Sequence, residues 1–157
     1  GLAINIAWIA ASLVVIAFAA WLIKRLCEEH LLVDAQLVTA LTLLLISPVS
    51  WSHHWVWLTL IIPVFLYRAW SWLSTGWAAG SLLTVLVAWA GMLLTVPPKW
   101  WWGDQVDVHA MERYQKFWVD DFVWLTILSV ALFAAAFYAS QRNNRNANTA
   151  TPVPLAS

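Results

Sequence analysis

The sequence predicts an all-α membrane protein, a polytopic bundle of about five spanning helices. Hydrophobic residues make up 62% of the 157 residues and charged residues only 10%, whereas about 25% of the residues in a soluble domain are charged. The mean hydropathy is +0.73, and the apolar residues form runs separated by shorter polar stretches. This composition excludes a soluble globule. The formal net charge of +0 gives no indication of nucleic-acid binding, so no nucleic-acid partner is expected, and the hydrophobic composition makes membrane lipid one expected partner.

The first apolar run covers residues 2–23, close to the ~20 residues that a spanning helix needs. Neither a Met nor a positively charged segment precedes it, so it resembles a transmembrane helix and not a signal peptide. Because Gly1 already lies in this hydrophobic run, we expect the chain to be the C-terminal part of a longer membrane enzyme.

Four further runs follow. Residues 35–47 and 55–67 are short, so they span roughly 30 Å only if the segment between them lies in the interface or is partly re-entrant. Residues 77–96 contain no charge and end before two prolines, and residues 122–138 form the last run.

Residues 1–140 are therefore predicted to be one transmembrane helical region. Residues 141–157 are polar, end with two prolines, and are predicted to form a disordered tail. The basic residues give the orientation, since Lys and Arg gather on the cytoplasmic side of a membrane protein. Under this topology five lie on the side of the tail (Lys24, Arg25, Arg68, Arg142 and Arg145) and three on the other (Lys99, Arg113 and Lys116). The tail is thus predicted to be cytoplasmic, and residues 47–57 and 99–121 (Ser47 to Trp57 and Lys99 to Asp121) extracytoplasmic, in the plasma membrane.

The segment that carries chemistry is 47–57, which reads Ser-Pro-Val-Ser-Trp-Ser-His-His-Trp-Val-Trp. Pro48 disfavours a helix before it, and Ser50 or Ser52 can cap a new helix whose first turn holds His53 and His54. Backbone N–H groups and the positive end of the helix dipole would then lie beside imidazoles and hydroxyls. Such an arrangement binds anions, and phosphate is the expected ligand.

Tryptophans flank the two histidines. The rings of Trp51 and Trp55 favour the membrane–water interface, and they can also stack on a sugar or an isoprenoid chain. The histidines could instead be packing residues, or metal ligands. Adjacent residues on a helix point about 100° apart, which argues against a shared metal ion, so no metal site is predicted. A role for a divalent metal cofactor stays open.

Segment 47–57 resembles the Ser-Pro-(Val/Ile)-Ser-Trp-x-His-His-x-x-Trp element of actinobacterial polyprenyl-phosphomannose-dependent mannosyltransferases, glycosyltransferase family 87 of GT-C type. The resemblance implies a GT-C-like C-terminal part of a multispanning, inverting enzyme. Such an enzyme takes mannose from polyprenyl-phosphate-mannose on the extracytoplasmic face and builds phosphatidylinositol mannosides or related lipoglycans. We assign donor-phosphate binding to His53, His54, Ser50 and Ser52, and sugar or lipid contact to Trp51 and Trp55.

The resemblance also concerns residues that this chain lacks. GT-C enzymes generally use an aspartate in the first extracytoplasmic loop as the base that deprotonates the acceptor, and that loop is absent from this sequence. Asp104 and Asp107 are interpreted as solvated loop carboxylates, so no catalytic residue is assigned and the segment alone is expected to be inactive. The alternative is a non-enzymatic membrane module that binds a lipid or lipid phosphate through the same segment.

Overall fold

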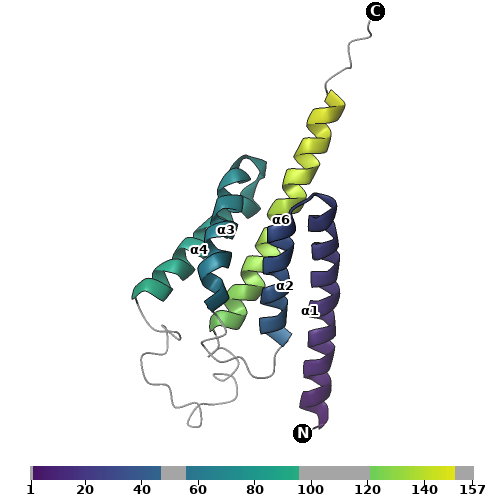
Figure 1. Cartoon of the computed structure of the whole chain (residues 1–157), viewed down its shortest axis with the longest axis vertical. Coiled ribbons are helices and arrows are strands. Elements are labelled where there is room, and N and C mark those ends of the chain that lie inside the picture. The colour runs from purple at the N-terminus through teal and green to yellow at the C-terminus, as the bar shows by residue number, and fades with distance from the viewer. Residues whose placement is uncertain (1, 47–55, 96–120, 151–157) are drawn as a thin grey trace, which may run out of the picture.

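The computed structural model describes residues 2–46, 56–95 and 121–150, and α-helices account for nearly all of them. These residues contain no strand, so the prediction of an all-α bundle is confirmed (Figure 1). In chain order the helices are α1 (Leu2–Glu28), α2 (Leu32–Ile46), α3 (Leu58–Ser71), α4 (Trp77–Thr95) and α6 (Asp121–Ala150).

Three of the described helices are long and apolar enough to cross a membrane. The qualifying segments are Asn5–Glu28, Trp77–Leu94 and Phe122–Thr149. Helices α2 and α3 are shorter, with 15 and 14 residues, and at 1.5 Å per residue each is only about 22 Å long. The two short runs expected from the sequence are therefore short helices, although α2 begins three residues before position 35.

The turn between α1 and α2 begins later than the end of the first apolar run at residue 23 suggests. Helix α1 continues to Glu28, whose carboxylate accepts a 3.0 Å hydrogen bond from Arg25 one turn earlier. His30 then adopts a positive φ of 58°. Its N–H donates to the Cys27 carbonyl at 3.0 Å, and the Leu31 N–H donates to the Leu26 carbonyl at 2.9 Å. These two bonds form a Schellman motif, which ends α1 and reverses the chain into α2.

The connection between α3 and α4 also begins later than the sequence suggests. The apolar run ends at residue 67, but α3 continues to Ser71 and a 3₁₀ turn (Leu73–Thr75) follows. Gly76, at φ 148°, provides a backbone conformation that other residues rarely adopt. Helix α4 starts directly after it, at the position expected from the sequence.

Aromatic rings dominate the packing of α3 and α4 against α6. Phe65 of α3 stacks on Phe133 of α6 with ring centroids 4.3 Å apart, and Trp72 lies 5.4 Å from the same ring. Trp89 of α4 meets Phe122 of α6 edge to face. All five side chains are buried. Such aromatic pairs add about 0.5–1.5 kcal/mol each to what burial alone contributes in water.

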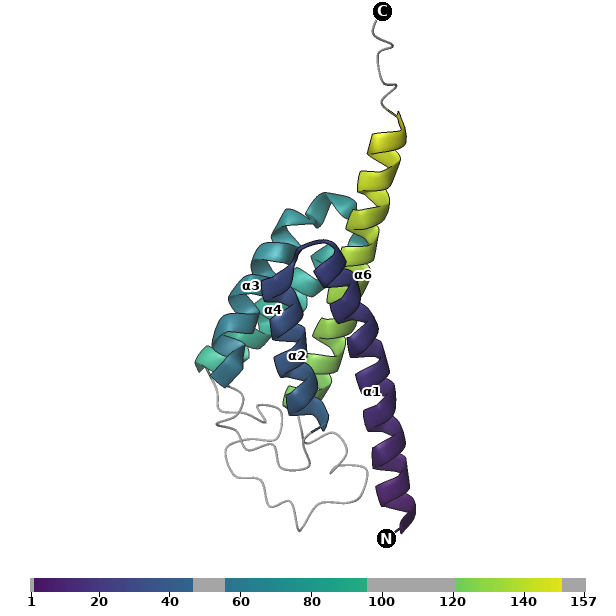
Figure 2. The ribbon, with the colours of Figure 1, turned by 45° about the vertical axis from the view of Figure 1, so that its right-hand side comes forward.

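Helix α1 joins this core only along its second half. Leu22 and Leu26 are fully buried, whereas Ile6, Leu13 and Val14 are 57–69% exposed. The first half of α1 stands clear of α3 and α4 in both views (Figure 2). An exposed apolar surface of this kind suits a lipid environment.

Helix α6 differs from the expected last span of residues 122–138. It extends to Ala150, ten residues into the segment 141–157 that was expected to lack structure. The reason is local: residues 139–150 contain no Gly or Pro, and the first helix breaker is Pro152. Polarity alone therefore did not end the helix. The cytoplasmic location of this segment stays a prediction.

Candidate functional site

The residues predicted to bind the donor lie outside the described part of the chain. They are Ser50, Trp51, Ser52, His53, His54 and Trp55. The structure does describe the two helices that flank them. Helix α2 ends at Ile46, a single 3₁₀ turn covers residues 56–57, and α3 begins at Leu58. Both flanking helix ends lie at the same end of the bundle (Figure 1).

The start of α3 directly follows the predicted phosphate-binding segment in the sequence. Trp57 has right-handed helical dihedral angles, φ −57° and ψ −23°, and its side chain makes no capping hydrogen bond. The Thr59 hydroxyl donates to the Val56 carbonyl at 2.7 Å. Helical geometry thus already holds at Trp57, so the N-terminal end of α3, where the dipole favours anions, adjoins residue 55. A helix start at Ser50 or Ser52 stays a prediction.

The second predicted extracytoplasmic segment attaches at the same end. Helix α4 ends there at Thr95 and α6 starts there at Asp121, while the C-terminal end of α1 and the N-terminal end of α2 lie at the opposite end (Figure 1). The described helices alternate in direction as the sequence-based topology requires. The side of the membrane that each end faces stays a prediction.

A buried ion pair joins α2 and α3 at the end opposite segment 47–55. The Arg68 guanidinium donates from Nε to Asp34 Oδ1 at 2.8 Å and from NH2 to Oδ2 at 2.6 Å. Asp34 is 0% exposed and Arg68 24% exposed. This two-bond arrangement is the strong, directional form of an Arg–carboxylate contact. It fixes how α2 and α3 lie against each other at one end, and these are the two helices that hold the predicted phosphate-binding segment between their other ends.

Sequence reasoning missed this pair. Arg68 was counted only among the basic residues that give the orientation, and Asp34 was assigned no role. The available signal was that each is an ionisable residue at the edge of an apolar run, since charges buried in membrane helices are almost always paired. Their separation of 34 positions gave no local clue to the partner. Among the described residues, no group of three or more His, Cys, Asp or Glu side chains is placed to hold a metal ion.

Fold and hydropathy thus define an all-helical membrane protein with an aromatic core. The chain matches no protein-family model and no solved structure, so a GT-C-like architecture stays a prediction. It is 28% identical, over 155 residues and 96% of its length, to the polyprenol-phosphate-mannose-dependent alpha-(1-2)-phosphatidylinositol mannoside mannosyltransferase of Mycobacterium tuberculosis. The protein of the same name from Mycolicibacterium smegmatis is 37% identical over 91 residues, 51% of this chain.

A third relative, again from Mycobacterium tuberculosis, is named as the corresponding phosphatidylinositol pentamannoside mannosyltransferase. It is 35% identical over 86 residues, 55% of this chain. All three relatives are much longer than the matched region. The chain spans 34% of the first relative, and the other two alignments cover 21% and 17% of theirs.

Proposed function

We propose that this chain belongs to a membrane mannosyltransferase that takes mannose from polyprenyl-phosphate-mannose and transfers it to a phosphatidylinositol mannoside or related lipoglycan. The observation that carries the proposal is the similarity across 96% of the chain to a relative whose name states both donor and acceptor. An alignment of that extent includes residues 47–57, which the sequence independently singles out for phosphate binding. A lipid-binding module without catalysis is not favoured, because all three relatives are named as transferases.

The proposed reaction is an inverting substitution at the anomeric carbon of mannose. The acceptor oxygen forms the new glycosidic bond, the bond to the donor phosphate oxygen breaks, and polyprenyl phosphate leaves with the electron pair. His53 and His54, with the hydroxyls of Ser50 and Ser52, donate hydrogen bonds to the phosphate as its negative charge grows. The position of the segment directly before α3 supports this role, since helix N-termini favour anions. Trp51 and Trp55 contact the sugar or the lipid chain.

The base that accepts the proton from the acceptor hydroxyl is proposed to lie in a part of the protein not included in this chain. The site faces the outside of the plasma membrane, because the bundle end that carries it is opposite the end with Lys24, Arg25 and Arg68. That basic end is proposed to be cytoplasmic.

Alanine substitution of the histidines in the full-length protein tests the proposal. We expect His53→Ala or His54→Ala to lower turnover by about 10²–10³, with the larger loss at His54, and to leave expression and thermal melting nearly unchanged. Transfer of labelled mannose from the polyprenyl donor is the measurement. His30→Asn is the matched control, because His30 lies at the opposite end and Asn tolerates its positive φ.

Two outcomes would contradict the assignment. One is turnover near wild type in both alanine variants. The other is loss of activity that follows loss of folding. A full-length protein that binds the polyprenyl donor without turning it over would instead favour the non-enzymatic lipid-binding module.

A further inference from the structure

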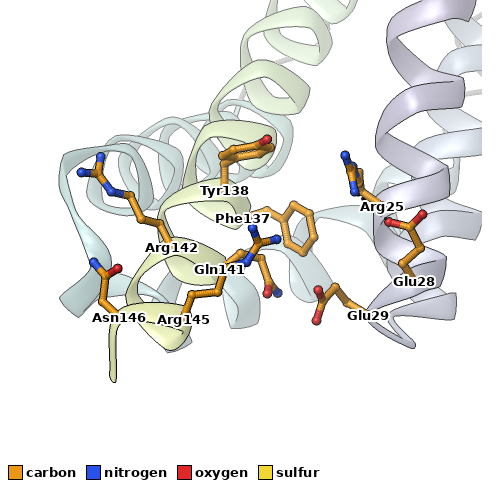
Figure 3. Close-up of a pocket in the computed structure, with 9 residues that line it drawn as sticks. All are labelled: Arg25, Glu28, Glu29, Phe137, Tyr138, Gln141, Arg142, Arg145 and Asn146. Atoms are coloured by element: carbon orange, nitrogen blue, oxygen red, sulfur yellow. Dashed lines mark hydrogen bonds and ion pairs between the residues drawn. The ribbon is translucent and has the colours of Figure 1, made fainter. Parts of the chain in front are cut away.

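A polar pocket of about 320 Å³ lies between the last turn of α1 and the second half of α6. It is at the end of the bundle opposite segment 47–55. Figure 3 shows the α1 side chains along one side of the pocket and the α6 side chains along the other. The charged residues and the tyrosine that line it are Arg25 and Glu28 of α1, Glu29 directly after α1, and Tyr138, Arg142 and Arg145 of α6.

Positive charge is in excess in this pocket. Three arginines and two glutamates line it, and Glu28 is already paired with Arg25 at 3.0 Å. Arg142 and Arg145 are exposed, and within the described ranges neither makes an ion pair or a hydrogen bond. Two guanidinium groups, three positions apart on α6, are therefore available to an anion, and a guanidinium binds phosphate through paired N–H donors.

Aromatic residues place the pocket at the level of lipid headgroups. Trp21 of α1 stacks on Tyr138 of α6 with ring centroids 6.0 Å apart, and Phe18 lies 5.6 Å from Trp21. All three rings are partly exposed, between 38% and 55%. Trp and Tyr are enriched where a membrane helix meets the headgroups. Tyr138 itself lines the pocket, so the arginines lie just beyond the apolar layer.

An apolar groove of about 280 Å³ continues along the same two helices, and Thr42 and Leu45 of α2 also line it. On α1, Phe18 lines the groove and Arg25, seven positions later, lines the pocket. On α6, Ala131 lines the groove while Tyr138 and Arg142, seven and eleven positions later, line the pocket. Residues at these spacings share one helix face. The groove and the pocket therefore follow one seam between α1 and α6.

We propose that this α1–α6 seam binds an anionic phospholipid, with the headgroup phosphate on Arg142 and Arg145 and an acyl chain in the apolar groove. A membrane lipid fits the seam better than free phosphate, because a soluble anion would leave the groove empty. Basic pockets between membrane helices are known to hold acidic headgroups. The inference does not depend on mannosyl transfer, since the arginines that bind the headgroup line the polar pocket, at the end of the bundle away from the helix ends that flank segment 47–55.

Lipid binding by the full-length protein in non-ionic detergent, followed by native mass spectrometry, tests this site. The probes are phosphatidylglycerol and phosphatidylcholine of equal chain length. We expect wild type to prefer phosphatidylglycerol, and Arg142→Gln with Arg145→Gln to weaken that binding about 25-fold, roughly fivefold for each charge near the headgroups. Lys24→Gln is the matched control, because Lys24 lies at the same end, is 76% exposed and does not line the pocket.

Further arms separate the remaining explanations. Arg142→Lys with Arg145→Lys, which keeps the charge, should retain most of the binding. A loss in this lysine variant as large as that in the glutamine variant would overturn the role of charge. An equal loss in Lys24→Gln would show a diffuse surface effect, and equal binding of phosphatidylcholine would show that only the acyl chain is held. Displacement of phosphatidylglycerol by inorganic phosphate at the same concentration would reveal a site for free anions. Each of these four results would overturn the proposal.

Discussion

Asp34 is a charged residue that the fold buries completely. It lies in the first turn of α2, one of two adjoining apolar helices, and is 0% exposed. A carboxylate in such a place stays ionised only if a partner replaces the water it has lost. Arg68 does so with two hydrogen bonds. Breaking a buried pair by removing one partner typically costs about 3–5 kcal/mol, because the other charge is left uncompensated.

Arg68→Gln should therefore destabilise the protein strongly, by about 3–5 kcal/mol. The double variant Asp34→Asn with Arg68→Gln should melt higher than Arg68→Gln alone, because no buried charge remains. Thermal melting in detergent measures both. Arg25→Gln is the control: its pair with Glu28 is 46% and 44% exposed, and such pairs contribute about 0–1 kcal/mol. Equal melting of Arg25→Gln and Arg68→Gln would contradict the structural role of the Asp34–Arg68 pair.

Two hydroxyl groups on α6 are buried and lack a hydrogen-bond partner among the described residues. Thr126 and Ser129 are 0% and 1% exposed, and in the described part of the chain neither side-chain oxygen has a hydrogen-bond partner. An unsatisfied buried polar group costs about 1–3 kcal/mol. We expect Thr126→Val, which keeps the shape and removes the hydroxyl, to raise the melting temperature. Thr42→Val should not, because the Thr42 hydroxyl donates to the Val38 carbonyl at 2.7 Å. A lower melting temperature for Thr126→Val would mean that its hydroxyl has a partner after all.

At the scale of elements, the alternating direction of the helices assigns every described helix end to one of two sides (Figure 1). Helix α1 ends beside Lys24 and Arg25, and α3 ends beside Arg68. The ends that flank segments 47–55 and 96–120 lie on the other side. Since positive charge marks the cytoplasmic face, one accessible residue at either end is enough to test the orientation.

Cys27 provides that test because it is exposed and belongs to the last turns of α1. A membrane-impermeant maleimide should fail to label Cys27 in intact cells and should label it after permeabilisation. In a Cys27→Ala background, Ser71→Cys should behave in the same way, since Ser71 ends α3 on the same side, whereas Gln105→Cys should be labelled in intact cells. The reverse pattern would overturn the orientation.

At the scale of the whole molecule, the chain corresponds to about a third of its first relative. Transfer of a sugar requires the phosphate site and the general base to be held together in one geometry, and no base is assigned among these 157 residues. Under the proposed function, the region is the donor-binding part of a larger enzyme.

The 157-residue chain expressed alone should therefore show no mannose transfer from polyprenyl-phosphate-mannose, while the full-length protein is active. The same radiolabel transfer assay checks both, with binding of the donor lipid as a control that the chain has folded. Measurable turnover by the isolated chain would place the base inside it, and Asp104, Asp107, Asp120 and Asp121 would be the residues to substitute next.

Local sequence patterns, namely apolar runs and the Gly and Pro residues that interrupt them, were sufficient to predict most of the fold. Apolar runs predicted the five helices, and the start of α4 at Trp77 was correct because it follows Gly76 directly. The candidate site rests on a sequence motif, since hydroxyls, imidazoles and a proline gather within 47–57, and it stays a prediction because residues 47–55 lie outside the described part of the chain. Helix ends were less accurate. The α1 terminus depends on the Schellman motif at His30, and α6 continued through polar residues because nothing before Pro152 breaks it.

Local sequence patterns could not predict the contacts between helices that are distant in the sequence. The Asp34–Arg68 pair, the Phe65–Phe133 stack and the seam joining Trp21 to Tyr138 each connect positions at least 34 residues apart. The mean hydropathy of a segment predicts that it forms a helix in the membrane. It does not predict which face of that helix packs against a neighbour, because the mean is the same for every rotation of the helix about its axis. Which faces meet is decided by the packing of all the helices together, because only then are buried charges paired and large rings fitted against one another.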